Sequence, residues 1–137
     1  MVNKSLIIVL AVLLTLPAAV LAQLEEAQPA LTVDAQLCIG VSDCIPVGAA
    51  DGFASDVGCV FLWCRVTGAQ DTTTIKHVWY YNAEEIASVE LPVNASPWRT
   101  WSSKTILPTW TGRWEVKILN TAGIELAVVP FTIGPGE

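Results

Sequence analysis

The chain has 137 residues, the size of one domain with or without a targeting segment. It is 53% hydrophobic and 15% charged, and 13 acidic against 7 basic residues give a net charge of -6. Nucleic acids and anionic membrane surfaces are bound through clustered Lys and Arg, so this charge balance argues against both as main partners.

The first 22 residues have the pattern of a secretory signal peptide. Lys4 precedes an apolar run from Leu6, Pro17 interrupts that run, and Val20 and Ala22 place small residues before the expected cleavage point. We therefore predict a signal peptide over residues 1–22 and a periplasmic or extracellular product. The alternative is an uncleaved membrane anchor over residues 6–22, which is at the short limit of a spanning helix. Only in that case is a membrane a partner.

Residues 23–31 are polar and contain Pro29, which predicts a flexible tether. From residue 32 to residue 137, turn signals recur about every ten residues between short β-rich runs. We expect an all-β domain: a small immunoglobulin-like antiparallel sandwich of about seven strands with few or no helices. The expected strands are residues 35–42, 57–67, 74–81, 86–92, 98–106, 112–119 and 123–133.

Two of these expected strands are informative in themselves. In residues 112–119, Trp114, Val116 and Ile118 alternate with charged residues, as in a strand with one face buried. Residues 57–67 are apolar on both faces, so we expect this strand to lie centrally in its sheet.

The four cysteines form an even set in a chain expected to be exported, which predicts two disulfides. Cys59 and Cys64 on one straight strand would be about 16 Å apart, too far for a bridge. If the first two expected strands are antiparallel neighbours, opposing residue numbers have a constant sum. That sum predicts the nested pairs Cys38–Cys64 and Cys44–Cys59, with the crossed pairing second. A zinc site fits the cysteine spacing poorly, so we expect no metal and no cofactor.

Three Trp-containing segments occur in order along the domain. They are His77-Val78-Trp79-Tyr80, then Trp98-Arg99-Thr100-Trp101-Ser102-Ser103-Lys104, then the pattern Gly112-x-Trp114-x-Val116. In this combination the chain resembles the bacterial domain-of-unknown-function family 2914. The resemblance implies a small exported or membrane-attached domain and no assigned activity. The cysteines are not part of the family pattern and are an addition in this chain.

The lone histidine and the adjacent acids offer little catalytic machinery. His77 shares a strand face with Ile75, Trp79 and Tyr81, so we interpret it as a histidine hydrogen-bonded within the sandwich, with a proton or ligand role as the alternative. Glu84 and Glu85 are expected to lie on a turn after Asn82, as a solvated loop rather than a glycosidase pair. We therefore expect no catalytic residues.

The segment from Trp98 to Lys104 is the candidate ligand site, and we assign Trp98, Arg99, Trp101 and Lys104 to it. Trp faces stack on sugar rings, and Arg or Lys beside them binds carboxylates. The alternative is that both tryptophans are packing residues.

The faces of this segment cannot be fixed from the sequence. A simple hairpin with residues 86–92 would place Arg99 opposite Leu91 and bury it, and a one-residue slip or a position in a different sheet would reverse the faces.

The sequence thus predicts a non-enzymatic cell-envelope domain that binds an envelope protein or a glycan. A purely structural or accessory domain of an envelope complex is the alternative, and an unrecognised hydrolase is a third reading.

Overall fold

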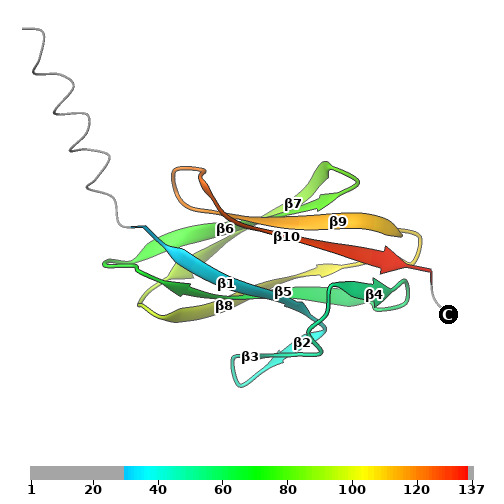
Figure 1. The fold of residues 1–137 in the computed structure, drawn as a ribbon, viewed down its shortest axis with the longest axis horizontal. Helices are drawn as coiled ribbons and strands as arrows, with labels where there is room; N and C mark the ends of the chain where they lie inside the picture. Colours follow the sequence, from blue (N-terminus) through cyan, green and yellow to red (C-terminus); the bar gives the residue numbers. More distant parts are fainter. Residues whose placement is uncertain (1–29, 136–137) are drawn as a thin grey trace, which may run out of the picture.

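A computed structural model describes residues 30–135 of the chain. The predicted signal peptide, the alternative membrane anchor and all but the last two residues of the predicted tether lie outside these residues. The described part is all-β, as predicted, and holds no helix that could span a membrane. Its strands, drawn in Figure 1, are β1 (Thr32–Cys38), β2 (Gly40–Ser42), β3 (Ile45–Val47), β4 (Gly52–Ala54), β5 (Cys59–Thr67), β6 (Thr73–Tyr81), β7 (Glu84–Val93), β8 (Trp98–Thr105), β9 (Gly112–Leu119) and β10 (Glu125–Gly134).

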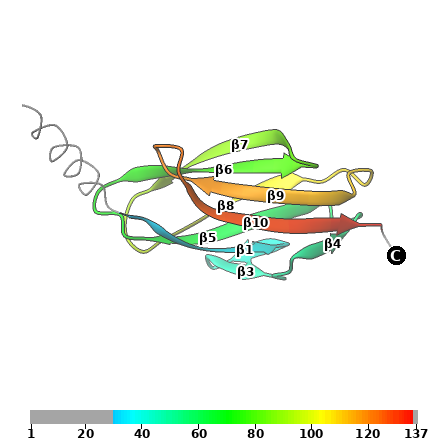
Figure 2. The same ribbon diagram turned by 45° about the horizontal axis from the view of Figure 1, so that its top comes forward.

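The strands form two facing sheets and one hairpin. The small sheet has the order β1-β5-β8, and the large sheet has the order β4-β10-β9-β6-β7. Neighbouring strands are antiparallel except for the parallel pair of β10 and β4. The short β2 and β3 form a separate hairpin. Figures 1 and 2 show the two sheets stacked as the layers of a sandwich.

The core lies between the two sheets because strands such as β9 alternate apolar residues on one face with polar residues on the other. In β9, Trp114, Val116 and Ile118 are buried while the charged residues between them point outward, as predicted. Trp114 stacks on Phe131 of β10 with ring centroids 5.6 Å apart, and Trp79 meets the same ring edge-on at 6.2 Å. These aromatic contacts join β6, β9 and β10 on the inner side of the large sheet.

Seven of the strands match the seven expected from the sequence, and β5 is central in its sheet as expected. Several strand ends differ from the expected ones by up to three residues, and the expected strand over residues 35–42 divides at Ile39 into β1 and β2. The backbone leaves β1 there, because the amide of Ile39 donates to the carbonyl of Val47 and closes the β2–β3 hairpin. The sequence did not predict β3 and β4, which have three residues each and are too short for an alternating pattern.

The structure does not show the predicted disulfides Cys38–Cys64 and Cys44–Cys59, since all four thiols are free. β1 and β5 are antiparallel neighbours as expected, but the register places Cys38 opposite Phe61 and Cys64 opposite Ala35. The predicted register was off by three residues. An odd shift also reverses faces, so Cys64 points into the core while Cys38 lies on the outer face of the sheet.

Candidate functional site

The outer face of the β5–β8 pair carries arginines and tryptophans in two adjacent rows. The register aligns Arg65 with Arg99 in one row and Trp63 with Trp101 in the next. We call these four residues the Arg/Trp face. They share one side of the sheet because residues two apart on a strand point the same way.

The two arginines of this face are exposed and lie directly opposite each other. Side chains of directly opposed residues start about 5 Å apart, so the two positive charges repel. Asp34 of β1 is aligned with Arg65 on the side away from β8. Within residues 30–135, none of the side chains of Asp34, Arg65 and Arg99 forms an ion pair. An anionic group placed at Arg99 would therefore relieve a repulsion that the protein leaves in place.

The two tryptophans of the face differ in exposure. Trp63 is 6% exposed, and its indole Nε1 donates to the carbonyl of Cys44 at 2.9 Å, so the turn of the β2–β3 hairpin lies over it. Trp101 is 37% exposed, and its indole makes no hydrogen bond within the described residues. Trp101 thus presents a partly exposed aromatic surface on the same face of β8 as Arg99, two residues along the strand.

The four residues assigned to the site from the sequence are divided by the strand. Arg99 and Trp101 point outward, whereas Trp98 is half-buried against the core. Lys104 is also half-buried on the inner side, with its Nζ 5.4 Å from the ring centroid of Trp110. The faces are decided by the sheets: β7 and β8 belong to different sheets, so Arg99 opposes Arg65 and not Leu91.

Arg65 and Trp63 were missed as site residues. The signal was available in the alternation of Phe61, Trp63 and Arg65 with Leu62, Cys64 and Val66 along β5. Because the whole run is apolar apart from the arginine, it was interpreted as a strand buried on both faces.

The inner side of the same two strands holds a buried polar cluster. His77 of β6 is fully buried, and its Nδ1 lies 2.6 Å from the Ser102 hydroxyl on β8. The Ser102 oxygen also accepts from the Trp79 indole at 3.3 Å, and the Cys64 sulfur lies 3.5 Å from the His77 Nε2. The cluster ties the two sheets together and confirms His77 as a histidine hydrogen-bonded within the sandwich.

This cluster combines a thiol, an imidazole and a hydroxyl, but its electrostatics oppose catalysis. Burial lowers the pKa of His77 to about 4, which keeps the ring neutral at pH 7. Burial also raises the pKa of the Cys64 thiol to about 12, whereas a nucleophilic cysteine needs a lowered pKa and access to solvent. No described buried side-chain polar atom lacks a partner, which fits a structural role.

Glu84 and Glu85 begin β7 directly after a turn at Asn82 and Ala83, both of which have positive φ. Both residues are exposed, which confirms that they are solvated, but they belong to the strand β7 and not to a loop as expected.

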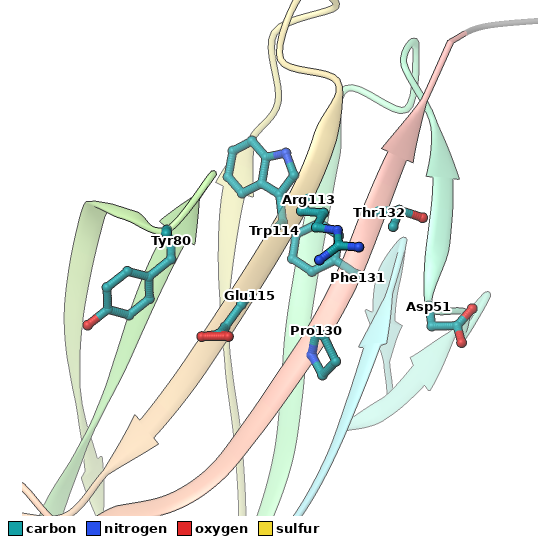
Figure 3. Close-up of a pocket in the computed structure, with 9 residues that line it drawn as sticks. Asp51, Tyr80, Arg113, Trp114, Glu115, Pro130, Phe131 and Thr132 are labelled. Carbon is teal, nitrogen blue, oxygen red and sulfur yellow. The ribbon is translucent and has the colours of Figure 1, made fainter.

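A groove of about 630 Å³ crosses the outer face of the large sheet. Figure 3 shows Glu115 between Tyr80 and Pro130, with Arg113 nearer Thr132 and Asp51. Two carboxylates against one guanidinium suit hydroxyl or amine donors better than an anion. The Tyr80 ring is already covered by Lys117, whose Nζ is 5.1 Å from its centroid, so we rank the groove below the Arg/Trp face.

No group of three or more His, Cys, Asp or Glu side chains within residues 30–135 is arranged to hold a metal ion.

The fold of the chain is similar to that of a solved archaeal domain. This is the CARDB domain of a Pyrococcus furiosus protein, solved in complex with di-metal ions, at 13% identity and a TM-score of 0.51. The likeness covers 80% of this chain and 96% of that one, and it supports the sandwich fold alone.

A solved engineered protein is also similar, at 15% identity and a TM-score of 0.41, covering 81% of this chain and 21% of that one. No curated protein matches the chain.

Residues 72–133 match the family described as protein of unknown function (DUF2914). The match takes in the strands that carry all three Trp-containing segments: β6, β8 and β9. This match confirms the resemblance to the DUF2914 family over residues 72–133 of the chain.

Proposed function

We propose that this chain is an exported, non-enzymatic binding module whose Arg/Trp face recognises an anionic ligand in the cell envelope. Export is supported by the signal pattern of residues 1–22. A non-enzymatic role is supported by the buried and fully partnered state of His77, Cys64 and Ser102.

The observation that carries the proposal is the unneutralised pair of Arg65 and Arg99 beside the exposed ring of Trp101. In a chain with a net charge of -6, two aligned arginines without an acid partner are not explained by stability. A carboxylate bound bidentately by a guanidinium, next to a flat apolar or sugar surface on the indole, satisfies both features.

The experiment measures binding of hexagalacturonate, a carboxylated oligosaccharide, and of cellohexaose, its neutral match, by calorimetry. The protein is expected to bind hexagalacturonate and not cellohexaose, and its affinity for hexagalacturonate should fall as the salt concentration rises. Arg99→Ala combined with Trp101→Ala is expected to abolish binding and to keep the thermal midpoint within a few degrees. Arg113→Ala, on the other sheet, is the matched control and should bind normally.

Two results would overturn the proposal. One is a double variant that fails to fold, because the face would then be structural. The other is binding that persists in the double variant or is lost equally in Arg113→Ala.

A structural or accessory domain is the second candidate. Exposed apolar side chains on and beside the β2–β3 hairpin favour it, since such patches mark contacts with other proteins. They are Ile39, Ile45 and Val47, each between 45% and 55% exposed.

A further inference from the structure

The strand that carries Arg99 and Trp101 is at the edge of its sheet. Within residues 30–135, β8 pairs with β5 on one side and with no strand on the other. The backbone amides and carbonyls along that free edge point away from the sheet and are available to another chain.

Natural edge strands are normally protected against such pairing by prolines, bulges or inward charges. The segment from Trp98 to Ser103 has no proline, bulge or inward charge, its one charged side chain is the outward Arg99, and its register with β5 runs without a shift. Pro97 precedes the segment, and the inward Lys104 follows it. Protection is thus found only at the two ends, and a window of six residues is left open.

The outer-face rows indicate which residues a further strand would carry. One row reads Asp34, Arg65 and Arg99 across β1, β5 and β8, so an acidic residue next to Arg99 would complete an alternation of acid, two bases and acid. The adjacent row reads Gln36, Trp63 and Trp101, so an apolar or aromatic residue would pack beside Trp101.

We propose that β8 accepts an extended acidic peptide as a fourth strand of the small sheet. In antiparallel orientation the peptide places an apolar residue opposite Trp101 and, two residues later, a Glu or Asp opposite Arg99. Main-chain hydrogen bonds supply affinity and the two outward side chains supply selectivity. This inference rests on the proposed function, because it assigns a ligand class to the same Arg/Trp face.

A second copy of β8 is a poorer occupant of this edge. It would bring another arginine, not an acid, to the outer face and extend the repulsion between Arg65 and Arg99. The charge of the face thus favours an acidic peptide over self-association.

The test uses an end-capped peptide of the sequence Thr-Val-Tyr-Val-Glu-Thr, titrated into the full chain. Two further versions are N-methylated at alternate residues: one at the amides that face β8, the other at the amides that face solvent. Methylation removes the donor but keeps the charge and the side chains. The solvent-facing version should bind like the parent and the β8-facing version should not bind.

Hydrogen exchange of the β8 amides gives a second readout. Peptide binding should slow exchange at alternate residues of Trp98–Ser103, the set not bonded to β5, and exchanging the peptide Glu for Gln should weaken binding about tenfold. Equal binding of both methylated peptides, or no alternate protection, would overturn strand addition.

The failure of this inference is distinguishable from failure of the proposed function. If hexagalacturonate binds through Arg99 and Trp101 while the peptide does not bind, the ligand is a glycan. In that case strand addition is wrong and the anion-binding face stands.

Discussion

The two sides of the β5–β8 pair use polar residues in opposite ways. On the inner side, Ser102, His77 and Cys64 are buried and each has a partner. On the outer side of the same two strands, Arg65 and Arg99 are exposed, aligned and without an acid partner in the described chain. Alternation along two strands thus separates a structural polar cluster from a charged surface.

The contrast indicates which side is under a stability constraint. A buried polar atom without a partner is costly, so the hydrogen bonds of the inner cluster stabilise the fold. Two opposed like charges on a sheet reduce stability slightly, so their presence indicates a role other than stabilising the fold. The tryptophans follow the same division, with Trp79 fully buried and Trp101 partly exposed.

Replacing the buried Trp79 and the partly exposed Trp101 by alanine, one at a time, should give the largest difference in the free energy of unfolding. Trp79→Ala removes a buried side chain that contacts Phe131 and donates to Ser102, and should lower the free energy of unfolding by about 3–5 kcal/mol. Trp101→Ala should cost less than half as much, since more than a third of this residue is exposed. Urea unfolding of both variants measures the difference, and equal losses would remove the distinction between the sides.

The inner side should also make stability depend on pH. The pKa of His77 is lowered from 6.5 to about 4 in the folded chain, so between these values the unfolded chain binds more protons. The stability that neutral His77 contributes is therefore fully present above pH 6.5. It is lost as the pH falls through 4, by about 3 kcal/mol in total. In His77→Gln, the free energy of unfolding measured with urea should change less with pH across this window than in the wild type. An unchanged pH dependence in that variant would contradict the role assigned to His77.

The adjacent serines of β8 allow the sharpest matched comparison. Ser102→Ala leaves the His77 Nδ1 and the Trp79 indole without their partner and should cost about 1–3 kcal/mol. Ser103→Ala, one residue along on the exposed side, should change stability by no more than about 0.5 kcal/mol. Thermal unfolding of the two variants is sufficient, and a larger loss for Ser103→Ala would place the wrong side inward.

Much of the fold could be predicted because β-strands with one buried face carry their own pattern. The alternation in β9 and the apolar run of β5 are local properties, so their strands and the position of β5 followed from the sequence. Pairing is not local. The register of β1 against β5 was off by three residues, and this error changed the face of Cys38 relative to Cys64.

The candidate site was half predicted for the same reason. Arg99 and Trp101 were identified as an aromatic and basic pair within one strand. Arg65 became their partner only when β8 was placed beside β5 and away from β7, which is a choice between sheets that the sequence left open. Residue type identified the chemistry, and topology identified the neighbour.

The most direct test of the role proposed for the Arg/Trp face is the free energy of unfolding of Arg99→Ala at low salt. If Arg99 serves only to bind a ligand, its removal relieves the repulsion from Arg65 and breaks no stabilising contact. The variant should then be as stable as the wild type or more stable, within the range of about 0.2–1 kcal/mol that a cross-strand pair contributes. The difference should disappear when salt screens both charges. A loss of more than about 1 kcal/mol would show that Arg99 has a structural partner and would contradict the account.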